Sequence, residues 1–308
     1  MRRRYGDSRF GKWMPVPIGL LGMMCFRSVA FMNLKYFNLK CFSVLCFILA
    51  LPLIAPAQTT PSLEVGYREM YNLQFEDAHN TFHNWQQLNP GDPMGPSSDA
   101  AAYLFSELDR LGVLQTELFV DDEKFKKAEK LVPDPAAKQG FDGSLNRSEL
   151  LADKALMGAP QDKNALFAEV MNHGLRGDYT ALIEKRRLAS LSDMKSAGTL
   201  ASKLLAMDPS YYDAYLAGGI ENYILGLSAA PLRWALRLYG AETDKDQGIA
   251  RLQLTAEKGH FMGPFARLLL AVAALRANNK PRARELLDSL AREFPHNKLY
   301  VRELARLQ

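Results

Sequence analysis

Residues 66–90 read GYREMYNLQFEDAHNTFHNWQQLNP, a stretch that predicts two helices joined by a tight turn. Apolar and small residues recur at spacings of three and four on both sides of the turn segment Leu73–Ala78, as they do where each helix buries one face. Ala78 lets two helices approach, Phe82 lies one turn further along the same face, and Pro90 ends the second helix. The stretch therefore indicates an antiparallel helical pair.

The same spacing recurs in three further segments of the chain. In each, a small residue is followed four positions later by a small or apolar residue, and a proline follows after eight more. The three segments contain Ala197, Ala201 and Pro209; Ala283, Leu287 and Pro295; and Ser148, Ala152 and Pro160. Polar residues stand shortly after two of the prolines, so we expect Asp162 and Asp213 to cap the helices that follow.

This pattern resembles the tetratricopeptide repeat, a helix-turn-helix unit of about 34 residues with an Ala-x3-Phe…Pro signature in its second helix. Turns like the one before Ala78 are expected at Gly177–Tyr179 and Asn278–Lys280. The stretch Pro209–Leu299 is similar, more loosely, to the tetratricopeptide repeat 39 family and to exported bacterial repeat proteins. The residues that carry this similarity are Tyr212–Tyr215, Gly219–Tyr223, Leu225, Gly226, Gly240, Asp244–Gly248 and Phe294–Asn297. The resemblance implies a helical repeat fold and supplies no catalytic residue.

The composition after Gln58 points to the same all-α class, because Ala, Leu, Glu, Lys and Arg are abundant and no segment reads as a strand. The prolines are unevenly spaced, which predicts an irregular superhelix of helical hairpins with about five pairs over residues 59–307. We expect a long helix near residues 180–206 and an interruption around residues 119–141. Residues 58–308 are expected to form this repeat domain.

The first 57 residues differ from the rest in charge and cysteine content. They hold eight of the 38 lysines and arginines and one of the 34 acidic residues, so residues 58–308 carry 30 basic and 33 acidic residues. This balance argues against a nucleic-acid partner. All three cysteines, Cys25, Cys41 and Cys46, also precede residue 58, which excludes a disulfide, a thiol nucleophile or a cysteine metal site in the later part.

Residues 41–54 are uncharged, follow Lys35 and Lys40, and precede Ala55–Ala57. This order predicts a signal peptide that is cleaved after Ala57, and hence a periplasmic or secreted protein. We expect residues 1–31 to be an over-extended start, that is, to precede the true first residue of the protein. The alternatives are an N-terminal membrane anchor and peripheral association with an outer membrane.

Few residues suggest chemistry. His79 and His83 have a zinc-like spacing but lack the glutamate of the metalloprotease motif, and His173 has no serine in a nucleophile elbow. The sequence contains no phosphate loop and no dinucleotide fingerprint, and we expect no cofactor. A metal-dependent hydrolase that uses these histidines in a helical pocket stays open as an alternative.

In a repeat array the first helix of each pair lines the concave face. We therefore expect a binding groove that contains Tyr67, Met70, Met171, Asp213, Ile220, Asn222, Tyr223 and Trp234. Amphipathic aromatic side chains suit a peptide or an apolar ligand, although they also serve as core between helices. The sequence thus predicts a non-enzymatic scaffold that binds another protein or a peptide, with a helical carrier of an apolar small molecule as a further alternative.

Overall fold

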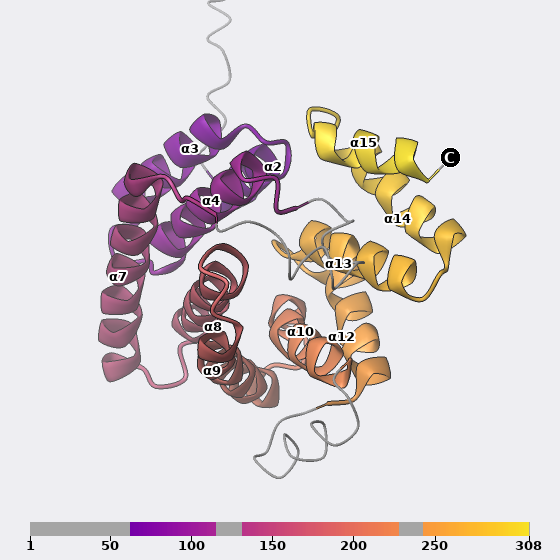
Figure 1. Cartoon of the computed structure of the whole chain (residues 1–308). Helices are drawn as coiled ribbons and strands as arrows, with labels where there is room; N and C mark the ends of the chain where they lie inside the picture. Colours follow the sequence, from indigo (N-terminus) through magenta and orange to yellow (C-terminus); the bar gives the residue numbers. More distant parts are fainter. Residues whose placement is uncertain (1–61, 115–130, 228–242, 308) are drawn as a thin grey trace, which may run out of the picture. The chain divides into compact units, whose positions relative to one another are not determined.

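The computed structural model describes residues 62–114, 131–227 and 243–307, and over these ranges the backbone is helical without a strand. The all-α prediction is thus confirmed (Figure 1). The α-helices are α2 (Leu63–Tyr71), α3 (Phe75–Leu88), α4 (Met94–Arg110), α7 (Pro135–Gly158), α8 (Lys163–Asp178), α9 (Arg187–Met207), α10 (Tyr215–Gly226), α12 (Lys245–Lys258), α13 (Gly263–Arg276), α14 (Lys280–Glu293) and α15 (Lys298–Arg306). A π-helical turn, Tyr179–Ile183, follows α8, and a 3-10 turn, Tyr212–Ala214, precedes α10.

The first pair, α2 and α3, forms as its spacing predicts. Leu73 takes a positive φ of 63° in the turn between them. Ala78 and Phe82 are fully buried, and a Cβ atom on Gly66 would lie 2.3 Å from the Phe82 ring. Gly66 is therefore needed because the aromatic ring occupies the space of a side chain at that position.

The three other segments with the same spacing of small residues and proline also form helices that bury these residues. The buried residues before the prolines are Ser148, Ala152, Ala197, Ala201, Ala283 and Leu287. α7, α9 and α14 each end two residues before the corresponding proline. Asp162 caps α8 by accepting the Ala165 N–H at 3.0 Å, as predicted, and Asn278 turns the chain between α13 and α14 with a φ of 56°.

The turn predicted at Gly177–Tyr179 is wrong. α8 continues to Asp178 and runs on into the π-helical turn, and the chain reverses only around Lys185, whose φ is 59°. The glycine serves helix packing instead, since a Cβ atom on Gly177 would lie 3.5 Å from Asp193 Cβ of α9. Burial of Tyr179 and Ile183 stabilises the helical conformation of the chain after Asp178.

Two other boundaries also differ from expectation. The interruption expected through Phe141 ends earlier, because Asp134 caps α7 by accepting the Ala136 N–H at 2.8 Å and Pro135 begins the helix. Residues 115–130 lie outside the described part of the chain. The long helix expected near residues 180–206 is α9, which begins at Arg187 and follows the π-helical turn and its reversal.

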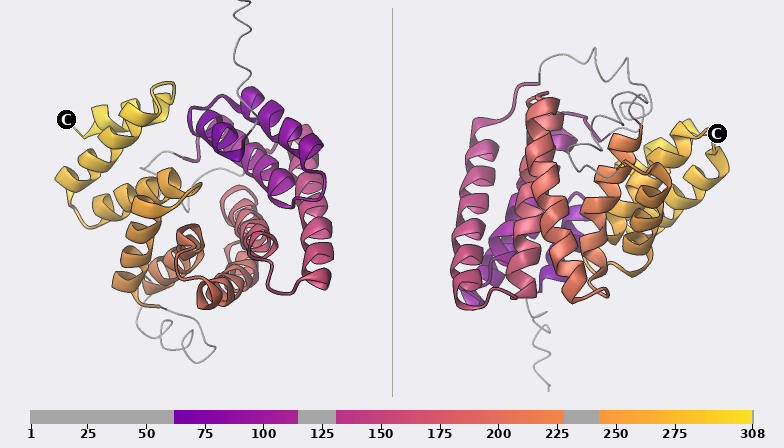
Figure 2. Two further views of the ribbon diagram at one scale, coloured as in Figure 1. Left: turned by 180° about the vertical axis from the view of Figure 1, so that it is seen from behind. Right: turned by 90° about the horizontal axis from the view of Figure 1, so that it is seen from below.

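The described helices pack against their neighbours in chain order and succeed one another around a common centre (Figure 1 and Figure 2). α2 also contacts connections near the C-terminus. Tyr71 Oη donates to the Phe261 carbonyl at 3.1 Å, and Asn297 Nδ2 donates to the Tyr71 carbonyl at 2.8 Å. The Tyr67 ring stacks on the Phe261 ring with a centroid distance of 4.8 Å. The inner faces of the helices are thereby brought around one shared space.

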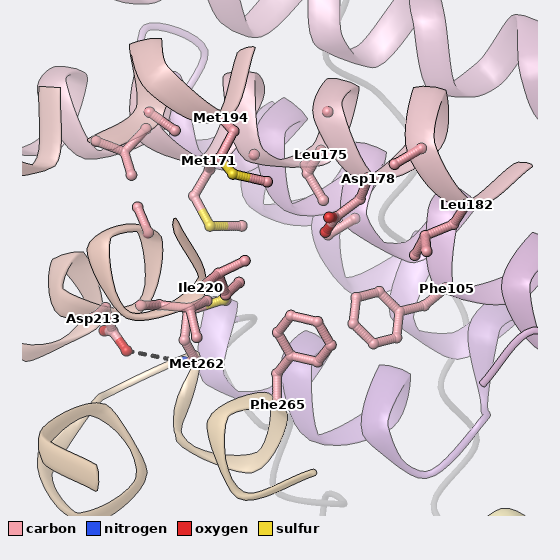
Figure 3. Close-up of a pocket in the computed structure, with 18 of the residues that line it drawn as sticks. Phe105, Met171, Leu175, Asp178, Leu182, Met194, Asp213, Ile220, Met262 and Phe265 are labelled. Carbon is pink, nitrogen blue, oxygen red and sulfur yellow. Dashed lines mark hydrogen bonds between the residues drawn. The ribbon is translucent and has the colours of Figure 1, made fainter. Parts of the chain in front are cut away.

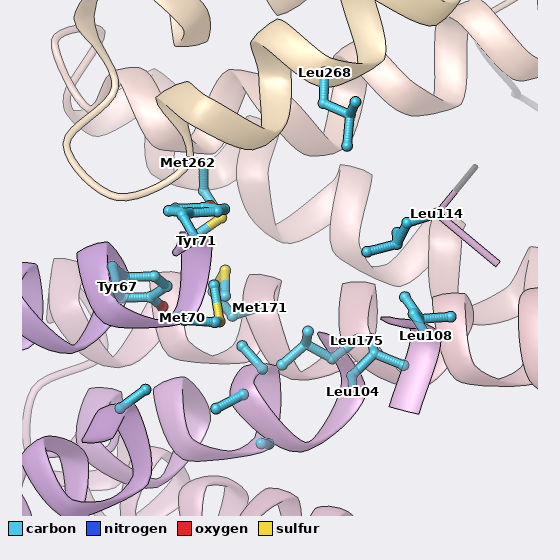
Figure 4. Packing of buried hydrophobic residues seen from close by; sticks show 14 of the residues in the cluster. Tyr67, Met70, Tyr71, Leu104, Leu108, Leu114, Met171, Leu175, Met262 and Leu268 are labelled. Carbon is cyan, nitrogen blue, oxygen red and sulfur yellow. The ribbon is translucent and has the colours of Figure 1, made fainter. Parts of the chain in front are cut away.

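Apolar side chains from distant helices meet at this centre. Figure 4 shows Tyr67, Met70 and Tyr71 of α2 close to Met171 of α8 and to Met262, which precedes α13. Among the helices of the described ranges, none has the length and apolar character needed to cross a bilayer.

Candidate functional site

Two adjoining cavities lie among the inner helix faces, with volumes of about 140 Å³ and about 460 Å³. Side chains of α2, α4, α8, the π-helical turn, α9, α10, α12 and α13 line them. The residues that line both cavities, which we call the junction, are Phe105, Asp178, Ala181, Leu182, Ser190, Met194, Ile220, Ile224 and Phe265. Asp178 and Ser190 are the polar members of this set, so the junction is apolar apart from one acid and one hydroxyl. Figure 3 shows Asp178 with the apolar members Phe105, Leu182, Met194, Ile220 and Phe265.

Most of the residues expected in a groove line these cavities. Tyr67, Met70, Met171 and Asp213 line the smaller cavity, Tyr223 lines the larger one, and Ile220 lines both. Their role in binding stays a prediction.

Two expected groove residues do not belong to the cavity walls that the structure describes. Asn222 is buried elsewhere, where its Nδ2 donates to the Gly218 carbonyl at 3.0 Å and its Oδ1 accepts the Asp244 N–H at 3.1 Å. Asn222 thus fixes the start of α12. Trp234 lies outside the described residues.

The tyrosines on α2 present their rings, rather than their hydroxyls, to the centre. Tyr67 Oη accepts a hydrogen bond from Ser98 Oγ at 3.1 Å, and Tyr71 Oη donates to the Phe261 carbonyl. Burial raises the pKa of both hydroxyls. The two side chains therefore remain neutral, and their polar ends are used within the helical framework.

Asp213 holds the wall of the smaller cavity together. It does not cap its own helix as predicted: Ala214 occupies the N-cap position of α10. The Asp213 carboxylate instead accepts the backbone N–H groups of His260 at 2.9 Å, Phe261 at 3.2 Å and Met262 at 2.9 Å. Burial raises the pKa of Asp213, and these three hydrogen bonds act in the opposite direction.

Asp178 is a site residue that sequence reasoning did not single out. It ends α8 and lines both cavities, and no described residue donates a hydrogen bond to it or forms an ion pair with it. Figure 3 shows its carboxyl between Leu175, Leu182 and Phe105. Burial in this apolar setting raises the pKa of Asp178 from 3.8 to about 7.

The π-helical turn after Asp178 decides which residues face the junction. Glu184 N–H donates to the Tyr179 carbonyl at 3.1 Å, a five-residue span that widens the helix. The turn carries Ala181 and Leu182 to the cavities. An aspartate in the predicted turn would be solvated, so no local pattern indicates that Asp178 faces inward.

Ser190 completes the polar part of the junction from the first turns of α9. Its Oγ donates to the Arg187 carbonyl at 2.8 Å, which leaves the oxygen lone pairs available to accept a hydrogen bond. A hydroxyl held in this way is an acceptor for a ligand rather than a nucleophile activated by a base.

The histidines are brought into contact with carboxylates. His79 Nδ1 lies 2.6 Å from Asp99 Oδ1 and His83 Nε2 lies 3.2 Å from Asp99 Oδ2, a carboxylate that the sequence did not indicate. His173 Nδ1 lies 3.0 Å from Asp193 Oδ1. Within the described part of the chain, no group of three or more His, Cys, Asp or Glu side chains is arranged to hold a metal ion.

No protein-family model matches the chain, and neither curated proteins nor solved structures give a significant match. What the geometry offers is a chamber of ligand-binding size with a mostly apolar wall and one partly buried acid, Asp178, without a partner among the described residues.

Proposed function

We propose that this chain is an exported, non-enzymatic helical repeat protein of the tetratricopeptide type that binds an apolar ligand in its central cavity. The cavity itself carries this proposal. Its larger part, about 460 Å³, falls within the range of about 300–1,000 Å³ that small-molecule sites occupy. Such sites have mostly apolar walls and few polar groups, a description that the junction fits.

The larger cavity is partly open, so solvent and a ligand can enter it. Water is held poorly where the wall offers few hydrogen-bonding partners, which favours its displacement by an apolar ligand.

The arrangement of the helices supports the tetratricopeptide type. If the described helices are paired as α2 with α3, α4 with α7, α8 with α9, α10 with α12 and α13 with α14, the first helix of each pair contributes residues to the cavity wall. Among the second helices, the described residues of α3, α7 and α14 do not line the cavities, whereas α9 contributes Ser190 and Met194 and α12 contributes Leu252. The inward position of every first helix is the feature expected of such repeats, and α9 and α12 depart from the strict division between inner and outer helices.

Export is the part of the proposal that rests on residues 1–57. Cleavage after Ala57 would leave a short segment before α2, which begins at Leu63. N-terminal sequencing of the protein recovered from the cell envelope and the medium tests this part. A start at Gln58 supports export, and a chain that keeps residues 41–54 in the membrane fraction contradicts cleavage.

Ligand binding is tested with an apolar fluorescent probe and a substitution that fills the junction. Leu182→Trp enlarges a side chain of the junction, and Leu188→Trp, at a position that is 86% exposed, is the matched control. We expect Leu182→Trp to weaken probe binding at least about tenfold because the probe and the indole compete for one space. Leu188→Trp should leave binding unchanged. Equal binding by both variants would contradict the cavity as the site.

Mass spectrometry of compounds extracted from the purified protein identifies the natural ligand. An apolar small molecule supports the carrier function. A retained peptide would instead favour the scaffold function that the sequence predicts, with the same cavity as its binding site.

A further inference from the structure

Asp178 has hydrogen-bonding capacity that the fold leaves unused. The other acid in the cavity walls, Asp213, already accepts three backbone N–H groups, whereas Asp178 has no donor among the described residues. Buried charges in proteins are generally paired, because an isolated carboxylate in an apolar setting is strongly disfavoured. A ligand bound in the cavity can supply the hydrogen-bonding partner that Asp178 lacks.

Among the described residues, no cation of the elements around Asp178 forms an ion pair with it. α4 faces the junction with Phe105, α10 with Ile220 and Ile224, and α13 with Phe265. Arg187 of α9 and Arg276 of α13 line only the larger cavity, and both have other interactions. Burial is the sole cause of the raised pKa of Asp178, so no described charge acts on it appreciably.

The tyrosines of the cavity walls stay neutral, because burial raises the pKa of the Tyr67, Tyr71 and Tyr223 hydroxyls. Tyr67 and Tyr71 use their hydroxyls in hydrogen bonds within the fold, whereas the Tyr223 hydroxyl, which lies outside the junction, has no partner among the described residues. The junction consequently offers a ligand one acid, Asp178, and one hydroxyl acceptor, Ser190, inside an apolar wall. Both groups accept hydrogen bonds, which is the complement of a donor that carries positive charge.

We propose that the cavity selects an apolar ligand that carries a protonated amine, whose ammonium group pairs with the Asp178 carboxylate and donates to Ser190 Oγ. This inference rests on the proposed function and adds the ligand class to it. The apolar parts of the ligand would extend from the junction into one or both cavities. A carboxylate ligand would meet a like charge there, and a neutral ligand would leave Asp178 without a counterion.

The probes for this proposal are a long-chain primary alkylamine, the alcohol and the fatty acid of the same chain length. Each is titrated against the purified full protein carrying the apolar fluorescent dye, and displacement gives its affinity. Asp178→Asn removes the charge at nearly constant size. Asp142→Asn is the matched control, because Asp142 pairs with Lys138 at 2.5 Å on α7, away from the cavities. Circular dichroism verifies that both variants are folded.

We expect the alkylamine to bind at least about tenfold more tightly than the alcohol, because charge-assisted hydrogen bonds are stronger than neutral ones. Asp178→Asn should weaken alkylamine binding by about tenfold or more and change alcohol binding by less than about twofold. Asp142→Asn should change neither affinity. The fatty acid should bind most weakly to the native protein.

The pH dependence of the native protein gives an independent readout. Protons compete with the ammonium group for Asp178, whose pKa in the empty cavity is about 7. Alkylamine affinity should therefore fall by up to about tenfold for each pH unit below 7, and this dependence should be absent in Asp178→Asn.

The outcomes separate the two proposals. If alkylamine and alcohol bind equally, or if Asp178→Asn binds the alkylamine as the native protein does, the amine selectivity is wrong while apolar binding stands. If none of the three probes displaces the dye and the dye itself does not bind, the proposed function fails and the ligand class fails with it.

Discussion

At the scale of one residue, Gly174 lies next to open space. It lies in the middle of α8 and lines the smaller cavity, and a Cβ atom on it would meet nothing within 4 Å. Glycine in a helix interior costs about 1 kcal/mol relative to alanine. We expect Gly174→Ala to raise the free energy of unfolding by about 0.5–1 kcal/mol, measured by urea denaturation.

A second glycine provides the control for this prediction. Gly66→Ala places a Cβ atom 2.3 Å from the Phe82 ring, so the same change there should lower the free energy of unfolding by about 1–3 kcal/mol. A destabilising Gly174→Ala would mean that α8 is packed where the structure leaves it open.

Asp178 should make the stability of the protein depend on pH. Its pKa is raised from 3.8 to about 7 by burial, so between these values the folded state holds a proton that the unfolded state releases. The free energy of unfolding should therefore fall as pH rises from about 4 to about 7. We expect a loss of about 2 kcal/mol, less than the full linkage value because the carboxyl retains access to the cavity.

This loss is measured by urea denaturation of the ligand-free protein at pH 5 and pH 8. Asp178→Asn has no such proton to hold, so the difference between the two pH values should shrink in that variant. A pH dependence equal to that of the native protein would show that another group causes it.

At the scale of elements, Asp213 ties the 3-10 turn before α10 to the connection between α12 and α13. Asp213→Ala would leave the N–H groups of His260, Phe261 and Met262 without their acceptor. A buried donor left unpaired costs about 1–3 kcal/mol, and the Met262 N–H is buried while the other two are partly buried, so we expect a loss of about 2–4 kcal/mol in the free energy of unfolding.

An ordinary helix cap gives the comparison. Asp162→Ala removes a single N-cap hydrogen bond, to the Ala165 N–H, and should cost only about 1 kcal/mol. Thermal denaturation of the two variants side by side measures the difference. Equal losses would mean that Asp213 acts as a simple cap, as the sequence suggested.

At the scale of the whole described unit, α2 is stabilised by residues near the other end of the chain. Deletion of residues 262–308 removes α13, α14 and α15 and uncovers Tyr67 and Tyr71, both of which are buried. We expect the truncated protein to aggregate and to lose cooperative unfolding, because its apolar inner faces become exposed. Size-exclusion chromatography and calorimetry test this expectation. A soluble remainder that unfolds cooperatively would contradict it.

The helical pairs could be predicted because their signals are local. Ala78 and Phe82 lie four residues apart on one face, and Pro90 follows where the helix must stop. The same locality explains why residues of the expected groove, such as Met171 and Ile220, do line the cavities: helical periodicity alone places them on an inner face.

The errors occurred where local signals and packing disagree. Gly177 has the composition of a turn, but close contact with α9 and the burial of Tyr179 keep the chain helical. Asp213 stands where a cap is expected, yet its carboxylate is used by N–H groups 47 to 49 positions away. No spacing rule contains partners at such a distance.

The sequence by itself determined the helical class, the helix ends before Pro90, Pro160, Pro209 and Pro295 and the small residues at which helices approach, because all of these follow from the 3.6-residue period and from the stereochemistry of proline and alanine. Only the tertiary structure decided the contact of α2 with connections 190 and 226 positions away, the chamber this contact helps to enclose, and the inward position of Asp178. The physical reason is that the size and position of the cavity depend on the packing angles of many helix pairs. Each packing angle depends in turn on side chains from two segments that are separate in the sequence.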